Sequence, residues 1–345
     1  MEQRYSIKSV RCSSIGRFLI ALLLVTNLTS CHREKTIVLS GEAQGTYYNV
    51  QYYDPQGRNL QQGIDSIFSD FDQTASLWVD NSLLRRINRN ETDSINSLFA
   101  TLLQKSIDIN HYTDGAFDCR IGRLVQLWGF SFKQREEPDS IRIAQLLQAA
   151  HADINIEPGR IIKQDTATEL DFNAIAQGYT SDMIGAYLES MGITNYLINV
   201  GGEVLAHGTK ADGKPWSVGV ERPAENQFSA PEVQTAVRLD NLALVTSGNY
   251  RKFYEKDGVK YSHTINPSTG YPVGHSLLSV SVVDSCAWRA DAMATAYMVM
   301  GLDSALSFIH QHRGGPGTGA VFFIYDNHGE MQTYATPEFE RIRIH

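Results

Sequence analysis

Helical and strand-like patterns follow one another along this 345-residue chain without regular alternation. Apolar residues repeat at helical spacing in residues 64–71, 98–109, 183–191 and 288–300. β-branched and aromatic residues typical of strands fill residues 37–53, 196–200, 216–221, 235–245 and 277–283, and a last strand pair is expected on either side of a turn at 326–329. A doubly wound parallel sheet needs strands and helices in regular alternation, so this order favours the α+β class.

Glycines and hydroxyl residues predict where two of the helices begin and end. Gly192 and Gly301 follow helical patterns and are expected to stop them, because glycine readily adopts the left-handed conformation at a helix C-terminus. Thr180 or Ser181 is a candidate N-cap for the helix that ends before Gly192. The polar stretch 131–142 is expected to be a surface loop, and no linker divides the chain.

The N-terminus has the pattern of an export signal. Four basic residues within positions 4–17 precede an apolar run, Phe18–Val25, that is too short to span a bilayer comfortably. Leu28–Cys31 then resembles a bacterial lipobox, in which the cysteine is lipidated and becomes the new N-terminus. We therefore expect residues 1–30 to be a signal peptide, 31–36 to be the lipidated Cys31 with a tether, and 37–345 to be the catalytic domain.

This N-terminal pattern predicts a location as well. A lipid on Cys31 would hold an exported protein on a bacterial membrane, facing the periplasm, without spanning it. An uncleaved anchor, or a plain signal with a chance cysteine, is the alternative.

Composition is that of an ordinary globular enzyme, with 42% hydrophobic and 20% charged residues and a net charge of −8. The acidic balance argues against a protein that binds nucleic-acid phosphates over a basic face. The sequence also lacks a phosphate-binding P-loop, a dinucleotide fingerprint, a Gly-x-Ser-x-Gly elbow and a His-Glu-x-x-His zinc motif. The usual nucleotide and hydrolase templates are therefore absent.

Polar and glycine-rich blocks are present instead. They are Gly41–Thr46, Thr113–Asp118 running on to Phe130, Asp171–Tyr179, Asn199–Glu203, Thr246–Tyr250, Tyr261–Gly270 and Ala290–Thr295. Each is weak evidence alone. In this order they resemble the family of bacterial FAD:protein FMN transferases, formerly regarded as thiamine-biosynthesis lipoproteins. The resemblance runs from about Gly41 to Gly301, behind the lipobox.

The resemblance implies both fold and activity. The implied fold is the family's own α+β architecture of mixed, largely antiparallel sheets with packed helices in one compact unit. The implied reaction transfers FMN from FAD to a Ser or Thr hydroxyl of a partner protein and releases AMP. The acceptor would be a membrane redox subunit.

Asp291 and Thr295 are the candidate metal ligands. They stand four residues apart in a predicted helix, so their oxygens share one face, and such oxygen ligands suit Mg²⁺. The resemblance adds the Ala174 carbonyl as a third ligand. From the residues alone, a helix-capping Asp291 and a surface Thr295 are the alternative to a metal site.

His263 is the candidate catalytic residue, because family members carry a similar Ser-His-Ile/Val-Asp-Pro segment and an imidazole can accept a hydroxyl proton at neutral pH. In this chain Asn266 replaces the usual Asp, so the positioning of the following loop is expected to differ.

The resemblance further implies a set of flavin contacts: Gln44, Trp78, Ala116, Phe117, Asp118, Asp171, Gln177 and Ile265. The Trp78 ring offers a face for stacking, although a structural tryptophan is the alternative. Asp118 and Asp171 are expected to bind ring N–H or ribose hydroxyl groups. Gln44 replaces a frequent Met, and Gln177 replaces a frequent Lys or Glu.

Two further activities stay open at this point. With water as the attacking group, the same site would be an FAD pyrophosphatase; without chemistry, the chain would be an FAD-binding lipoprotein. Cys119 and Cys286 adjoin the Asp118 and Asp291 blocks, so a disulfide between them is a further expectation.

Overall fold

The computed structural model describes residues 35–130, 139–223, 232–249, 253–256 and 259–344. An eight-stranded antiparallel sheet forms its centre, in the order β1-β2-β5-β6-β9-β12-β13-β14. Its strands are β1 Lys35–Ala43, β2 Thr46–Asp54, β5 Tyr196–Val200, β6 Glu203–His207, β9 Leu242–Gly248, β12 Leu277–Asp284, β13 Ala320–Asn327 and β14 Glu330–Ala335. The α+β class with largely antiparallel sheets is confirmed.

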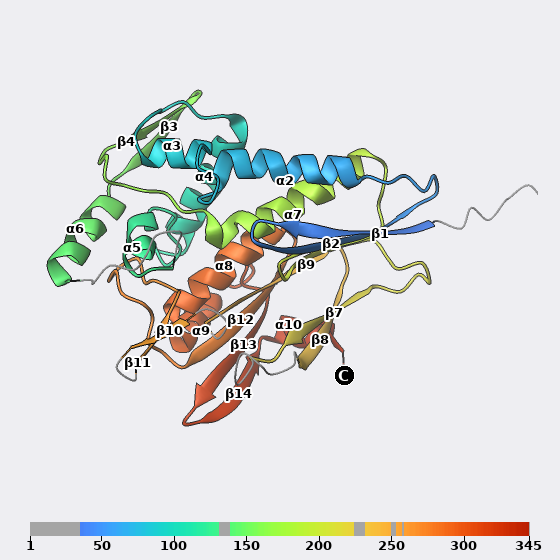
Figure 1. Cartoon of the computed structure of the whole chain (residues 1–345). Helices are drawn as coiled ribbons and strands as arrows, with labels where there is room; N and C mark the ends of the chain where they lie inside the picture. The colour runs from blue at the N-terminus through green and yellow to red at the C-terminus, as the bar shows by residue number, and fades with distance from the viewer. Residues whose placement is uncertain (1–34, 131–138, 224–231, 250–252, 257–258, 345) are drawn as a thin grey trace, which may run out of the picture.

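Helices cover one face of this sheet, and a smaller sheet covers the other (Figure 1). The helical layer holds α2 Gln61–Ala75, α4 Ser97–Tyr112, α7 Asn173–Ser190, α8 Ala287–Met300 and α9 Leu302–Gln311. The opposite face packs against β7 Trp216–Glu221, β8 Val233–Leu239 and α10 Pro337–Ile342. β15 Arg343–Ile344 completes the three-stranded sheet β15-β8-β7. Buried side chains of both layers pack against the central sheet, which therefore lies between the two parts of the hydrophobic core.

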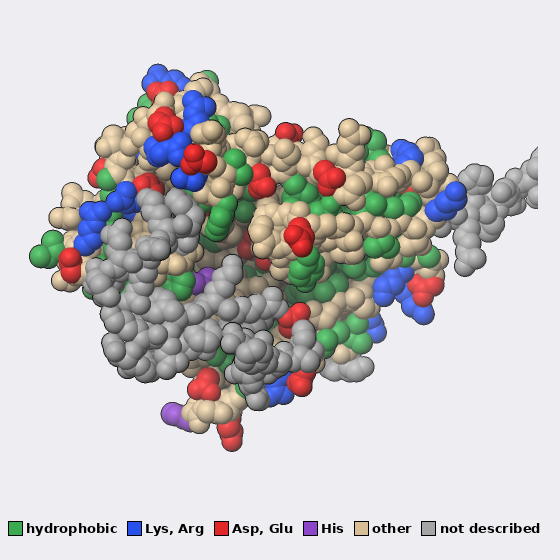
Figure 2. Space-filling model, viewed as in Figure 1, with side chains coloured by type: hydrophobic (Ala, Val, Ile, Leu, Met, Phe, Trp, Pro, Cys, Tyr) green, Lys and Arg blue, Asp and Glu red, His purple; other side chains and the backbone are tan. Residues whose placement is uncertain are grey.

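Short elements complete the fold. They are α3 Leu83–Asn88, α5 Gly122–Leu127, α6 Ser140–Ala150, and the hairpins β3 Ile154–Glu157 with β4 Arg160–Lys163 and β10 Phe253–Lys256 with β11 Val259–Ser262. No helix within the described ranges is both long enough and apolar enough to cross a membrane. Lys and Arg side chains are interspersed with Asp and Glu on the face seen in Figure 2.

Several predicted boundaries are confirmed, and four are corrected. Gly192 and Gly301 end α7 and α8 with φ of 79° and 76°, and the 326–329 turn joins β13 to β14. The strand-like run 37–53 is a hairpin, because Gln44 and Gly45 turn the chain with φ of 52° and 70°. The run 235–245 is likewise broken at Asn241, where φ is 53°.

The start of α7 was predicted wrongly. Thr180 and Ser181 do not cap this helix, because α7 begins at Asn173 and their hydroxyls donate to the carbonyls of Ala176 and Gln177 at 2.9 and 3.0 Å. In the 131–142 region, α6 begins at Ser140 behind an Asp139 N-cap, while residues 131–138 and Cys31 lie outside the described ranges.

Candidate active site

Helices α7 and α8 pack side by side and run in opposite directions. Near the start of α8, the Asp182 carboxylate accepts the N–H groups of Ala287 and Trp288 at 2.9 and 2.8 Å. One turn earlier in α7 and one turn later in α8, the Gly178 N–H donates to Asp291 at 3.1 Å. The next turn in each direction reaches Ala174 in α7 and Thr295 in α8. The register therefore directs these two residues toward the same place.

Asp291 is a buried carboxylate with 6% of its surface exposed. Burial is the main cause that raises its pKa to about 7; the Gly178 hydrogen bond opposes this and nearby Asp182 adds to it. A buried carboxylate of this kind is stabilised by a cation. The Thr295 hydroxyl adds an oxygen, which lies 3.4 Å from the Ser247 hydroxyl.

Ala174 fits the third position through its backbone. In an α-helix its carbonyl would receive the N–H of Gly178, and that N–H also donates to Asp291. The Gly178 N–H thus lies between the Ala174 carbonyl and the Asp291 carboxylate. No group of three or more His, Cys, Asp or Glu suited to a metal occurs among the described residues. One carboxylate, one hydroxyl and one carbonyl instead fit Mg²⁺, which keeps several waters.

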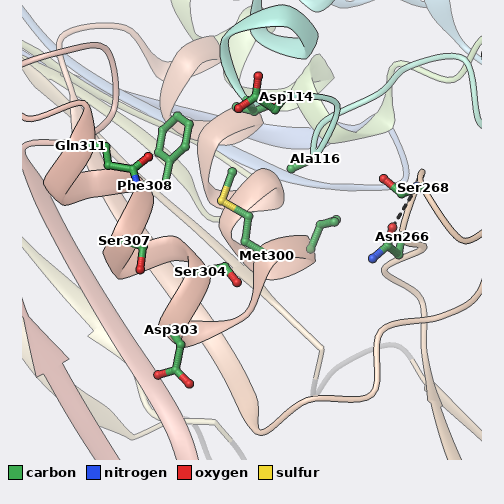
Figure 3. Close-up of a pocket in the computed structure, with 12 residues that line it drawn as sticks. Asp114, Ala116, Asn266, Ser268, Met300, Asp303, Ser304, Ser307, Phe308 and Gln311 are labelled. Atoms are coloured by element: carbon green, nitrogen blue, oxygen red, sulfur yellow. Dashed lines mark hydrogen bonds between the residues drawn. The ribbon is translucent and has the colours of Figure 1, made fainter.

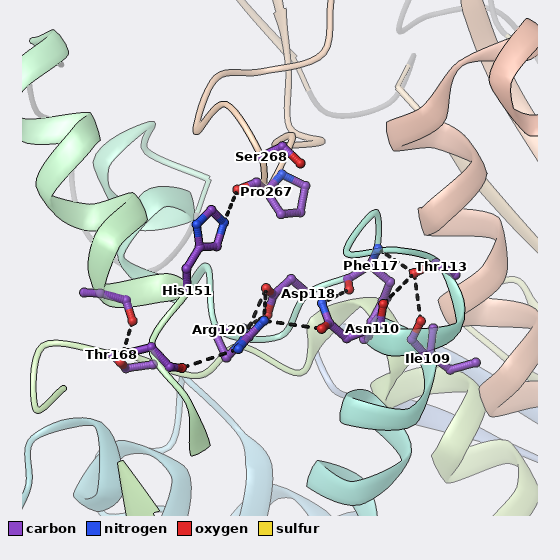
Figure 4. Close-up of polar contacts among 12 residues, drawn as sticks. Ile109, Asn110, Thr113, Phe117, Asp118, Arg120, His151, Thr168, Pro267 and Ser268 are labelled. Atoms are coloured by element: carbon purple, nitrogen blue, oxygen red, sulfur yellow. Dashed lines mark hydrogen bonds and ion pairs between the residues drawn. The ribbon is translucent and has the colours of Figure 1, made fainter. Parts of the chain in front are cut away.

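The loop Thr113–Asp118 follows α4 in a strained turn. Asp114 has φ of 49°, and Gly115 follows with φ of 81°. The Thr113 hydroxyl accepts the Phe117 N–H at 3.1 Å, and the Asn110 amide donates to the Phe117 carbonyl at 2.7 Å (Figure 4). The Phe117 ring is buried in the core, whereas Ala116 is partly exposed. These bonds fix the loop that carries three predicted flavin contacts.

Asp118 is already paired within the protein. Its carboxylate binds the Arg120 guanidinium at 2.8 Å, and Arg120 also reaches the Asn110 side chain at 3.3 Å (Figure 4). Only 2% of the Asp118 side chain is exposed. The pair anchors the loop to α4, and a direct bond from this carboxylate to the flavin stays a prediction.

Asp171 joins two of the predicted blocks. Its N–H donates to the Cys119 carbonyl at 2.7 Å, and its carboxylate accepts the Asn173 N–H at 2.8 Å at the start of α7. Burial raises the pKa of this carboxyl to about 6, against the opposing Asn173 hydrogen bonds. A buried carboxyl beside the Thr113–Asp118 loop is suited to bind a ligand N–H or hydroxyl.

The β1–β2 hairpin brings Gln44 to α7. Its amide donates to the Thr180 hydroxyl at 2.8 Å. Gln177 lies against Gly201 of the Asn199–Glu203 block. A Cβ added to Gly201 would stand 2.9 Å from the side-chain amide nitrogen of Gln177. Trp78, just after α2, is 61% exposed and so presents an open ring face.

His263 and Ile265 follow β11. The half-buried His263 ring lies edge-on to Phe130, with centroids 6.3 Å apart. Ile265 is 3% exposed and packs with residues of α5 and α6, so its backbone is the part suited to meet a ligand. Asn266 accepts the Ser268 N–H at 2.8 Å, the turn bond that an Asp would make. The difference expected from this replacement is therefore small within this turn.

A cavity of about 560 Å³ adjoins this region. Ala116 and Asn266 line one side, and Asp303, Ser304 and Ser307 of α9 line the other (Figure 3). No residue of α9 is among the predicted site residues.

The expected disulfide is wrong. Cys119 and Cys286 are free thiols within the described part of the chain. Cys119 is buried, and this burial raises the pKa of its thiol. Proximity of each cysteine to a site block along the sequence does not bring the two sulfurs together.

Sequence reasoning also missed two residues that hold α7 against α8. Gly178 belongs to the Asp171–Tyr179 block but was given no role, and Asp182 lies three residues beyond that block. Their spacing of four residues in one helix was a usable signal, because such residues share a face.

Comparison with known proteins gives one consistent result. The model of the ApbE family matches residues 44–318. The FAD:protein FMN transferase of Vibrio cholerae is 34% identical over 303 residues, covering 84% of this chain and 89% of that protein. The Escherichia coli K12 protein of the same name is 30% identical over 328 residues, covering 91% of each chain.

Solved structures agree with these matches. The structure of the flavin transferase ApbE from Vibrio cholerae covers 90% of this chain and 99% of its own, with 30% identity and a TM-score of 0.78. An apo flavinyl transferase ApbE from Pseudomonas stutzeri has the same identity and TM-score. Like these relatives, the chain is an enzyme of the transferase class, and it belongs to the ApbE family.

Proposed function

We propose that this enzyme transfers FMN from FAD to a Ser or Thr hydroxyl of a partner protein, releases AMP, and requires Mg²⁺ held by Asp291, Thr295 and the Ala174 carbonyl. The observation that supports this proposal is the α7–α8 register, in which Gly178 pairs with Asp291 while Ala174 lies one turn earlier in α7 and Thr295 one turn later in α8. The relatives' name supplies FAD as the substrate and a protein as the acceptor.

The proposed reaction is a substitution at the FMN phosphorus. The acceptor oxygen forms a bond to that phosphorus, the bond to the AMP oxygen breaks, and AMP leaves with the bonding electron pair. His263 takes the proton of the acceptor hydroxyl as the new bond forms. When bound by Asp291, Thr295 and the Ala174 carbonyl, Mg²⁺ would supply positive charge to offset the charge that builds on the pyrophosphate oxygens.

The remaining residues bind and orient FAD. Asp171 supplies a buried carboxyl, Trp78 an exposed ring for stacking, and Ala116 a partly exposed point on a loop held by Asn110 and Thr113. We assign Gln44, Phe117, Asp118, Gln177 and Ile265 to the same flavin site.

Intact-mass analysis separates this function from its two alternatives. The full chain is incubated with FAD, Mg²⁺ and a candidate acceptor. An acceptor heavier by one FMN, together with free AMP, supports transfer. FMN and AMP without an adduct would mean hydrolysis, and unchanged bound FAD would mean storage. Replacing the acceptor Ser or Thr by Ala is the matched control and should abolish the adduct.

We further propose that lipid on Cys31 anchors the enzyme to a bacterial membrane, facing the periplasm, where a membrane redox subunit is the acceptor. The support is the lipobox-like Leu28–Cys31 behind a basic and apolar leader. Cys31→Ala should release the protein from the membrane fraction or block its processing. A correctly trimmed Cys31→Ala protein that still fractionates with membranes would contradict the anchor.

A further inference from the structure

We propose that Asp182 is a positioning residue of the metal site: its carboxylate fixes the first turn of α8 and thereby holds Asp291 and Thr295 against Ala174. This inference rests on the proposed function, since it needs the Asp291 site to bind the metal. It concerns a residue that contributes no ligand itself.

Asp182 caps α8 from a different helix. Its two carboxylate oxygens accept separate backbone N–H groups, Oδ1 that of Ala287 at 2.9 Å and Oδ2 that of Trp288 at 2.8 Å. The first N–H groups of a helix have no partner within the helix. The N-cap residue of α8 is Cys286, and its side chain makes no capping hydrogen bond with the described residues. Asp182 therefore does the work that a local cap would otherwise do, and it ties α8 to α7.

The tie sets the position of the ligands because of the spacing. Ala287 and Asp291 are one turn apart in α8, and Asp182 and Gly178 are one turn apart in α7. The two helices are thus joined at two successive levels, by Asp182 at the start of α8 and, one turn later, by the Gly178 N–H at Asp291. Without the Asp182 hydrogen bonds, the Gly178–Asp291 bond alone does not fix the rotation of α8 about its axis. Thr295 lies one further turn away from that bond.

Neighbouring groups support this placement. The Lys105 ammonium of α4 lies over the Trp288 ring, 4.0 Å from its centroid. The Asp284 carboxylate, just before α8, binds the Arg289 guanidinium and accepts the Gly317 N–H at 2.9 Å. The start of α8 is therefore held from three sides, and the Asp182 hydrogen bonds are the side that ties it to the helix that carries Ala174.

The test compares Asp182→Ala and Asp182→Asn with the wild-type full chain. Binding of Mn²⁺ or Mg²⁺ is measured by titration calorimetry with FAD present, and transfer is measured as kcat and as KM for FAD. Loss of a group that orients a metal ligand weakens metal binding by about tenfold or more. We expect that loss for Asp182→Ala, a lower kcat and an unchanged KM. Asp182→Asn keeps one acceptor oxygen, so its metal affinity and kcat should lie between those of the wild type and of Asp182→Ala.

Asp54→Asn is the matched control. Asp54 is also a buried carboxylate that accepts two backbone N–H groups, those of Gln56 and Arg58, but it lies at the end of β2. The Asp54→Asn substitution should lower stability in urea while leaving metal affinity unchanged. The inference is overturned if Asp182→Ala binds Mn²⁺ with the affinity of the wild type. It is also overturned if Asp54→Asn lowers Mn²⁺ affinity as much as an Asp182 variant that loses the same amount of stability. Absence of metal binding in the wild type itself would instead overturn the proposed function.

Discussion

The backbone N–H of Gly178 donates a hydrogen bond to the Asp291 carboxylate at 3.1 Å, across the contact between α7 and α8. The helices are so close here that a Cβ on residue 178 would stand 2.4 Å from the Ala287 carbonyl oxygen and 2.9 Å from the Asp291 Cβ. The first of these neighbours is backbone, which cannot rotate away. The contact therefore depends on the absence of a side chain at position 178.

Gly178→Ala should separate α7 from α8. We expect it to lower the free energy of unfolding by about 1–3 kcal/mol through overpacking, and to weaken metal binding because Asp291 moves from Ala174. Gly185→Ala in the same helix is the control, since its Cβ would meet the Leu205 and Tyr196 side chains rather than backbone. Urea unfolding and calorimetry measure both effects. Equal metal affinity in the two variants would contradict this account of the contact.

Asp291→Ala and His263→Ala should fail in different ways. Loss of the Asp291 carboxylate should abolish tight Mg²⁺ binding and slow transfer by about 100-fold or more, because charge stabilisation is lost. His263→Ala should keep metal and FAD binding but slow the proton transfer. Single-turnover kinetics and metal titration distinguish the two. Near-normal transfer with unchanged Mg²⁺ dependence in Asp291→Ala would place the reaction centre elsewhere.

Trp78→Ala should weaken FAD binding without weakening the fold. The ring is 61% exposed, so its removal should change stability by less than about 0.5 kcal/mol. Loss of an aromatic ring on which a base stacks costs about 1–3 kcal/mol, which corresponds to roughly 5- to 150-fold in affinity. Fluorescence titration with FAD gives the affinity, and Trp78→Phe should restore most of it. Unchanged affinity in the alanine variant would remove Trp78 from the flavin site.

Asp54 should contribute to stability in a defined pH range. Its hydrogen bond to Arg58 is the main cause that lowers the pKa of this carboxyl from 3.8 to about 2. Because the folded pKa is the lower one, the stabilisation is complete above the unfolded pKa and is lost as the pH falls from about 4 to about 2. Melting temperatures across this range should fall less steeply for Asp54→Asn than for the wild type. Parallel curves would contradict the assignment.

Periodicity predicted α2 well and α7 poorly, for a physical reason. α2 buries Ile64, Phe68 and Phe71 on one face and leaves the other exposed, so its apolar residues repeat visibly. The buried face of α7 includes Gly178, Thr180 and Gly185. Close packing against α8 requires small residues at such positions, and small or hydroxyl residues carry little apolar signal. The first turns of α7 were therefore missed.

The resemblance supplied the residues of the candidate site, but not their arrangement. Spacing alone showed that Asp291 and Thr295 share a helix face. That Ala174 lies opposite them follows from the pairing of α7 with α8, which no local pattern in either helix encodes. The same limit explains the expected disulfide, since closeness to a block in sequence does not fix the direction of a Cys119 or Cys286 side chain.

The bond between Gly178 and Asp291 joins positions 113 residues apart. A nascent chain that has released α7 but not α8 holds one of the three proposed metal ligands, Ala174, and the other two are made only when nearly nine-tenths of the protein has been synthesised. Contacts of such long range form late and slowly in folding. On the proposed assignment the metal therefore has no complete set of ligands before α8 has packed against α7, and a truncated fragment that ends before α8 should transfer no FMN.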